Sequence, residues 1–199
     1  MDTQSETAAP EPLRGSGERY GFVDLAQSRS VVLEAIMRSA QAPRLEQLTG
    51  WEFNGLNTAS VTKPLGIRKF KKGFYRGPAR VPHGPDPYVQ GYNLAVRQNA
   101  LQAPHIPRSS DRPRRFGFYR VHRVVPGSRD DLYSNALLLD YGLGGNGPRP
   151  ERFLRDYLVQ VYADDPNLLL GKAYVAAGPK RLAVSFFVLE RSNPHDFTG

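Results

Sequence analysis

The sequence contains no cysteine. This absence excludes a disulfide framework, thiol catalysis and the cysteine-rich kind of zinc site, so only histidine, aspartate or glutamate could bind a metal ion. The histidines are scattered without the His-x-His or HExxH spacing that brings ligands together. They are His83, His105, His122 and His195. The sequence therefore predicts no metal site.

Long apolar runs are also lacking, since no uninterrupted run approaches the ~18 residues of a membrane span. The first residues, MDTQSETAAPEPLRGSGERYG, have no basic segment followed by an apolar one, as a secretory signal would. We therefore expect a soluble, cytoplasmic protein without a transmembrane segment.

Most catalytic signatures are missing as well. The sequence has no Gly-x-Ser-x-Gly elbow, no Walker-type Gly-Lys-Ser/Thr and no dinucleotide fingerprint, and its GLGGNG run at residues 142–147 is typical of a loop. No cofactor is expected on these grounds. Whether the protein is an enzyme stays open, because some chemistry needs no recognisable motif.

The composition is that of a folded, basic protein of one domain. Of the 199 residues, 40% are hydrophobic, and 10 Tyr, 10 Phe and 1 Trp supply enough bulk for a core. The 27 Lys and Arg exceed the 19 Asp and Glu, which gives a net charge of +8. Polyanions, membrane surfaces and acidic small molecules therefore all stay open as partners.

The pattern along the chain divides it into four segments. Residues 1–20 are rich in Ala, Pro, Glu and Ser without hydrophobic periodicity, which predicts a disordered tail. Residues 21–44 form a helical segment, in which the helical spacing of Leu33, Ile36, Met37 and Ala40 predicts a helix from Ser30 that ends before Pro43. Residues 45–192 form the main β domain, and residues 193–199 form a C-terminal tail.

The main domain contains about eight alternating apolar runs separated by Gly, Pro, Asn and Asp clusters. The runs cover residues 48–54, 66–75, 88–98, 115–125, 133–142, 153–162, 168–176 and 181–191. Short turns between consecutive runs favour an antiparallel meander, and closing the meander removes its exposed edges. We predict a mainly β fold, an eight-stranded antiparallel up-and-down barrel with an N-terminal helix; a two-sheet sandwich is the alternative.

Two ends of this pattern resemble the calycin superfamily of small barrels, which includes lipocalins, fatty-acid-binding proteins and nitrobindin-like barrels. The resemblance rests on LTGWEFNG at residues 48–55 and FFVLER at residues 186–191. It implies that Trp51 on the first strand is covered by Arg191 from the last strand, which would close one end of the barrel. The segments 137–140, 155–156 and 169–171 are also similar to bacterial small-barrel proteins of the Gly-x-Trp-x-Gly type.

Polar side chains within apolar alternation are the candidate site residues, because burial in a lumen would require a partner or a ligand. A lysine or arginine could bind a carboxylate or phosphate, and tyrosine rings could orient an apolar body. The ligand-binding candidates are Tyr92, Arg97, Tyr119, Tyr133, Tyr141, Lys172, Tyr174 and Phe186. The catalytic candidates are Asp140, Lys172 and His122, although Asp140, Arg155 and Asp156 could instead form an internal salt-bridge cluster.

Three functions remain open. The leading hypothesis is the binding of a small hydrophobic or amphipathic ligand inside the barrel. The second is a cofactor-independent cyclase or isomerase that shapes a hydrophobic intermediate. The third is binding of nucleic acid or another polyanion through the basic segments at residues 63–80 and 108–123, which interleave cations with aromatic residues. The oligomeric state cannot be predicted from the sequence.

Overall fold

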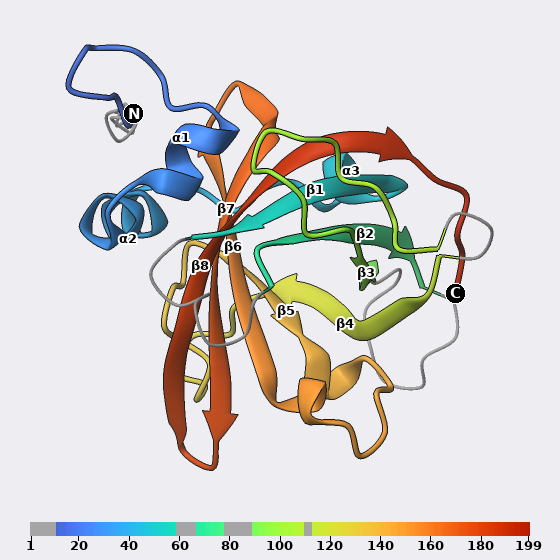
Figure 1. Cartoon of the computed structure of the whole chain (residues 1–199). Helices are drawn as coiled ribbons and strands as arrows, with labels where there is room; N and C mark the ends of the chain where they lie inside the picture. The colour runs from blue at the N-terminus through green and yellow to red at the C-terminus, as the bar shows by residue number, and fades with distance from the viewer. Residues whose placement is uncertain (1–10, 59–66, 78–88, 110–112) are drawn as a thin grey trace, which may run out of the picture.

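The computed structural model describes residues 11–58, 67–77, 89–109 and 113–199. Within these residues, each strand pairs antiparallel with the next, and the last strand pairs with the first, so the sheet closes into a barrel (Figure 1). The strands are β1 (Trp51–Asn57), β2 (Lys69–Arg76), β3 (Val89–Ala95), β4 (Arg115–Arg123), β5 (Leu137–Asp140), β6 (Leu154–Tyr162), β7 (Asp165–Ala177) and β8 (Lys180–Pro194). The predicted eight-stranded up-and-down barrel is confirmed, and the sandwich is excluded.

In the described part of the chain before the first strand there are three helices: α1 (Phe22–Gln27), α2 (Ser30–Ser39) and α3 (Leu45–Leu48). Helix α2 is the one predicted from Ser30. Its last carbonyls are satisfied by the Asn135 side chain, which donates to Met37 O at 2.9 Å and to Ala40 O at 2.6 Å. Helices α1 and α3 span 6 and 4 residues, too few for a periodic pattern to be seen in the sequence. Two 3₁₀ turns, η1 (Tyr141–Leu143) and η2 (Pro150–Phe153), connect β5 to β6.

Two separate apolar layers stabilise the barrel. The outer layer lies between helices α1 and α2 and strands β6, β7 and β8, where Leu33 and Met37 of α2 join the same buried cluster as Tyr157 and Leu170 (Figure 1). The inner layer fills the lumen, and Leu48 of α3 belongs to it. Strands β6 to β8 are therefore buried on both faces, so both sets of alternating side chains are apolar.

Large side chains occupy the middle of the lumen. Phe53, Phe74, Tyr119, Leu139 and Leu158 are all 0% exposed. The rings are accommodated by glycine on neighbouring strands: a Cβ placed at Gly91 would lie 2.1 Å from the Tyr119 ring. Among the described residues, the centre of the barrel is thus a packed core, which leaves little uncovered surface for a ligand.

One end of the barrel is tied by the pair expected from the resemblance. The guanidinium carbon of Arg191 lies 4.7 Å from the centre of the Trp51 ring. Arg191 also donates to Gln47 O of α3 at 2.7 Å and approaches Pro166 O of β7 at 3.5 Å. A single side chain therefore connects the first strand, the last strand, α3 and the start of β7.

Candidate functional site

The lumen contains a buried polar cluster centred on Lys72 of β2. Its ammonium donates to Asn93 Oδ1 at 3.0 Å, to Asp156 Oδ2 at 3.0 Å and to the Tyr141 hydroxyl. The Tyr141 hydroxyl in turn donates to Asp156 Oδ2 at 2.9 Å. All three donors of the ammonium are used, as a buried cation requires.

The charges of this cluster are almost completely shielded from water. Burial lowers the pKa of Lys72, and the Asp156 carboxylate opposes that shift. The second carboxylate oxygen, Asp156 Oδ1, is buried and accepts no hydrogen bond from the described residues. Because Lys72 is only 2% exposed and Asp156 only 3%, the pair has the surroundings of a structural ion pair rather than of an open reaction site.

Four of the predicted ligand-binding residues lie outside the lumen, in the layer between the barrel and α2; three are on strands, and Tyr133 is in the connection from β4 to β5. The four are Tyr133, Lys172, Tyr174 and Phe186. Lys172 donates to Glu34 Oε2 of α2 at 2.7 Å and to the Tyr133 hydroxyl at 2.9 Å. Burial alone would raise the pKa of Glu34, but Lys172 and Tyr133 hold it below its ordinary value. This network docks α2 on β7 and does not face the lumen.

Of the other predicted tyrosines, two line the lumen and one does not. Tyr119 and Tyr141 lie in the inner layer, 5.0 Å apart between ring centres. Tyr92 points outward, alternating with the inward Asn93, and donates to Glu52 Oε1 at 3.0 Å. Its ring packs against Phe197 at 5.0 Å between ring centres.

The remaining candidates are also separated from one another. Arg97 is exposed beyond the end of β3. The His122 ring lies on the outer side of β4, with Nδ1 2.8 Å from Arg123 O. The Asp140 carboxylate accepts from Gly142 N at 2.7 Å and pairs with Arg155 at 3.1 Å. Two members of the expected salt-bridge cluster, Asp140 and Arg155, form an ion pair, whereas the third, Asp156, pairs with Lys72 in the lumen.

The first basic segment contributes fewer surface charges than its sequence suggests. Lys69, Lys71 and Lys72 are 1%, 6% and 2% exposed, and each has partners in the fold. Lys63 and Arg80 of this segment, Arg112 of the second and His83 lie outside the described residues. The three lysines of β2 are therefore not available to a phosphate backbone.

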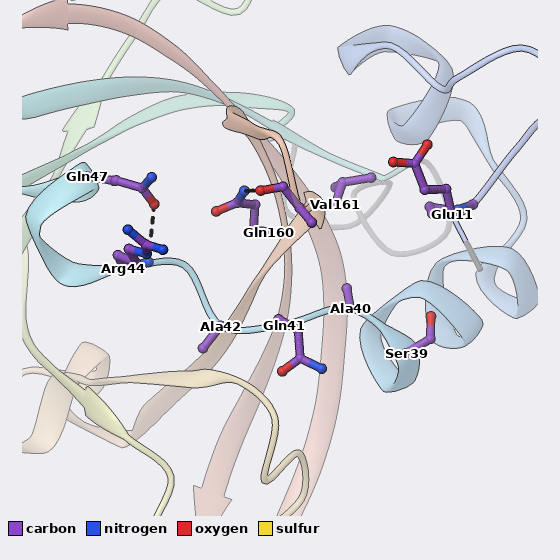
Figure 2. A pocket seen from close by; sticks show the side chains of 11 residues that line it. Glu11, Ser39, Ala40, Gln41, Ala42, Arg44, Gln47, Gln160 and Val161 are labelled. Atoms are coloured by element: carbon purple, nitrogen blue, oxygen red, sulfur yellow. Dashed lines mark hydrogen bonds between the residues drawn. The ribbon is translucent and has the colours of Figure 1, made fainter. Parts of the chain in front are cut away.

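A cavity of about 370 Å³ opens at the rim of the barrel, where residues 40–44 cross the end of β6 (Figure 2). We call it the β6 cavity. It is lined by Glu11, Pro12, Ser39, Ala40, Gln41, Ala42, Arg44, Gln47, Gln160, Val161 and Ala163. Strand β5 reaches only Leu158 of β6, so Gln160 N lacks a partner on that side and donates instead to Gln41 O at 2.8 Å. Both residues of this bridge line the cavity.

The polar groups of the β6 cavity are amides and one cation. Gln160 is 8% exposed, and its Nε2 donates to Tyr162 O at 2.7 Å and to Ala163 O at 3.0 Å. Arg44 is exposed, and no carboxylate of the described residues lies within ion-pair distance of it. Ala40, Ala42 and Val161 supply the apolar wall.

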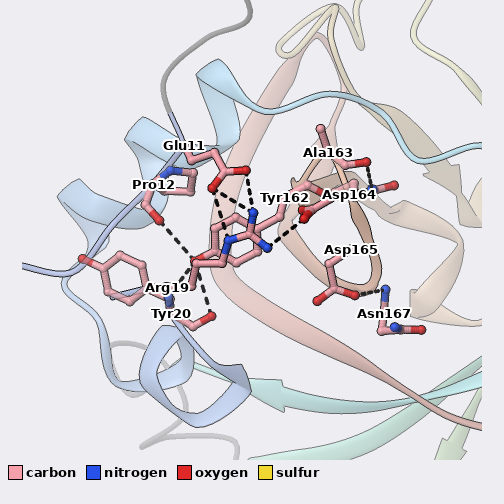
Figure 3. A network of polar contacts seen from close by, with 10 residues as sticks. Glu11, Pro12, Arg19, Tyr20, Tyr162, Ala163, Asp164, Asp165 and Asn167 are labelled. Atoms are coloured by element: carbon pink, nitrogen blue, oxygen red, sulfur yellow. Dashed lines mark hydrogen bonds and ion pairs between the residues drawn. The ribbon is translucent and has the colours of Figure 1, made fainter. Parts of the chain in front are cut away.

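The chain before α1 forms one side of this cavity. Figure 3 shows Arg19 between Glu11 and Asp164, with its guanidinium over the Tyr162 ring at 4.6 Å. Arg19 donates to Glu11 Oε1 at 2.7 Å and to Asp164 Oδ2 at 3.0 Å. Residues 11–20, part of the segment expected as a disordered tail, are thus held against the β6–β7 turn.

Lys72 was predicted only as part of the basic segment at residues 63–80, and Asn93 and Arg44 were not predicted as site residues. A signal for Lys72 was present, because Phe70, Lys72 and Phe74 alternate and must share one face of a strand. Arg44 gives no such signal: its position at a cavity depends on how residues 40–44 cross β6, a long-range contact that periodicity does not encode.

Comparisons of the chain with known protein families, with curated proteins and with solved structures found no match. Among the described residues, no three His, Asp or Glu side chains converge as a metal site would require. In the same part of the chain, every helix is too short or too polar to span a membrane.

Proposed function

We propose that the protein binds a small amphipathic anion, a carboxylate with an apolar body, in the β6 cavity. The proposal keeps the ligand class favoured by the sequence and places it at the rim of the barrel instead of the lumen. The observation that carries it is a cavity of about 370 Å³ with an apolar wall and an arginine that has no acidic partner among the described residues. Cavities of roughly 300–1,000 Å³ are typical of small-molecule sites.

The charges around the cavity favour an anion. Arg44 lines the cavity, and its planar guanidinium could bind a carboxylate through two parallel hydrogen bonds, which lysine could not do. Among the described residues, the carboxylate in the wall is that of Glu11, which pairs with Arg19 at 2.7 Å; Arg19 also pairs with Asp164 at 3.0 Å. The net charge of +8 adds a general attraction for acidic ligands.

The lining residues divide the ligand between two environments. Ala40, Ala42 and Val161 would cover its apolar body, and the Gln41 amide could donate to the carboxylate. The Nε2 of Gln160 already donates to Tyr162 O and Ala163 O, so Gln160 could offer only its Oε1, to a ligand hydroxyl. A ligand that covers this wall removes apolar surface of both the protein and the ligand from water, which stabilises the complex by about 25 cal/mol per Å². Both parts are needed, so we expect neither acetate nor a long-chain alcohol to bind as well as an amphipathic carboxylate.

The test is calorimetric titration with decanoate, with 1-decanol and acetate as partial ligands. Wild-type protein should bind decanoate, and Arg44→Gln should weaken it about tenfold, since a charge-assisted bidentate contact is worth at least 1.4 kcal/mol. Arg97→Gln, which removes an exposed arginine outside the cavity, is the matched control and should leave the affinity unchanged. Equal decanoate affinity of wild type and Arg44→Gln, or no binding by wild type, would contradict the proposal.

A further inference from the structure

A second cavity, of about 410 Å³, lies between α1, the segment at residues 101–105 and the outer face of β1 and β8. We call it the α1 cavity. It shares no lining residue with the β6 cavity. Its apolar walls include Phe22, Leu101 and Pro104. It is large enough for a small organic molecule, and its chemistry differs from that of the β6 cavity.

The charged residues that line the α1 cavity are both acidic. Glu190 and Asp24 contribute carboxylates, and none of the described residues of the wall is a lysine or arginine. Asp24 is already engaged, because it accepts from Gly21 N at 2.9 Å and pairs with Arg14 at 3.4 Å. Glu190 is an exposed residue of β8 with no ion-pair partner among the described residues, and partial desolvation together with Asp165 raises its pKa. The Glu190 carboxylate would therefore gain from a cation beside it.

Asn54 stands next to Glu190 in the sheet, because the two are cross-strand partners of β1 and β8. The Asn54 amide oxygen is buried and accepts no hydrogen bond from the described residues. A buried acceptor without a donor costs free energy, and rotation of the Asn54 amide about χ2 would turn its oxygen to the cavity, where a donor could satisfy it. Glu190 thus offers one acceptor at this side of the cavity, and Asn54 offers an adjacent one after that rotation.

His105 adds a third acceptor. Burial lowers the pKa of His105 to about 4, so its ring is neutral at pH 7. Its Nε2 lies 3.1 Å from Gly55 O, and since a carbonyl only accepts, Nε2 carries the proton and Nδ1 is left as an acceptor. A neutral His105 also does not repel a cation.

Two lysines lie near this region and are already occupied. Lys69 donates to Asn99 Oδ1 at 2.6 Å and to Ala100 O at 3.0 Å, which holds the segment that forms the cavity wall. Lys71 pairs with Glu52 at 3.4 Å. Neither lysine lines the cavity, and neither fills the acceptors at Glu190 and Asn54.

We propose that the α1 cavity binds a small organic cation, an alkylammonium whose head group lies at Glu190 and Asn54 and whose apolar part packs against Phe22 and Leu101. An aromatic face next to carboxylate and amide acceptors is the usual environment of a bound ammonium. A metal ion is a poorer occupant, because no three ligating side chains converge among the described residues. The proposal does not depend on the function assigned to the β6 cavity.

The test is NMR titration of the full chain with butylammonium at pH 7, with 1-pentanol as the neutral analogue of similar size. Butylammonium should shift the His105 ring and the backbone amides of residues 101–105, and 1-pentanol should bind at least fivefold more weakly. Glu190→Gln should weaken butylammonium about tenfold. The matched control is Glu46→Gln, an exposed glutamate on α3 outside the cavity, which should change nothing.

Three outcomes would overturn the proposal. Equal binding of the alcohol and the ammonium would show an apolar pocket without charge selectivity. An unchanged affinity in Glu190→Gln would remove the assigned head-group contact. The absence of shifts at residues 101–105 would show that butylammonium does not enter the cavity. Because decanoate and butylammonium report on different lining residues, failure here leaves the β6 cavity proposal intact, and the reverse also holds.

Discussion

The Lys72 ammonium lies 3.0 Å from the Asp156 carboxylate in the middle of the barrel, and both side chains are almost fully buried. They come from β2 and β6, which are not neighbours in the sheet. The pair therefore crosses the lumen and links opposite walls of the barrel. Its desolvation cost is offset only while both members are present.

Removing one member of the Lys72–Asp156 pair should lower the free energy of unfolding more than removing both. We expect Lys72→Met to lower the free energy of unfolding by about 3–5 kcal/mol, because Asp156 is left buried without its partner. The double variant Lys72→Met with Asp156→Leu should recover part of that loss. Urea unfolding followed by circular dichroism measures both.

Lys180→Met is the control for this experiment, since Lys180 is exposed at the β7–β8 turn and should change stability by less than about 0.5 kcal/mol. If Lys72→Met cost no more than that control, the ion pair would have no structural role.

Arg191 offers a spectroscopic test of barrel closure, because its partner Trp51 is the only tryptophan. Arg191→Gln should shift Trp51 emission to longer wavelength and lower stability by about 2 kcal/mol, since the ring contact and the bond to Gln47 O are lost. Arg123→Gln, at an exposed end of β4, should leave the emission unchanged. An unaltered spectrum in Arg191→Gln would show that the stacking is dispensable.

The strand pattern could be predicted from the sequence because alternation and turn residues are local signals. Which face of each strand points into the barrel could not be predicted, because β6 to β8 are apolar on both faces. Lys172 and Tyr174 were predicted to face the lumen but lie in the layer next to α2. The helix supplies a second apolar surface, which an alternating strand pattern cannot distinguish from the core of the barrel. Lys72, by contrast, alternates with Phe70 and Phe74 and could have been placed inside.

Residues 11–20 should become more mobile when the ion pairs of Arg19 are removed. Arg19→Ala deletes the ion pairs to Glu11 and Asp164, so trypsin should cleave after Arg14 faster than in wild type. Because Glu11 lines the β6 cavity, decanoate affinity should fall severalfold. Arg29→Ala, an exposed arginine before α2, should alter neither. Unchanged cleavage in Arg19→Ala would mean that other contacts hold this segment.

Stability should fall as the pH is lowered from 6.5 to about 4, in part because of His105. Burial holds its folded pKa at about 4, below the usual 6.5, so the unfolded chain binds the proton first. The stabilisation is complete above pH 6.5 and is lost towards pH 4, with a contribution on the order of 2 kcal/mol. In urea titrations at several pH values, His105→Asn should flatten this dependence; an equal slope in the variant would contradict the assignment.

The most direct test of the account is to locate bound decanoate by heteronuclear NMR. If the ligand occupies the β6 cavity, the largest shifts should fall on the backbone amides of Gln41, Gln160 and Ala163, and the lumen signals of Asn93 and Tyr141 should barely move. If the largest shifts fall on Asn93 and Tyr141 instead, the ligand enters the barrel and the rim site is wrong.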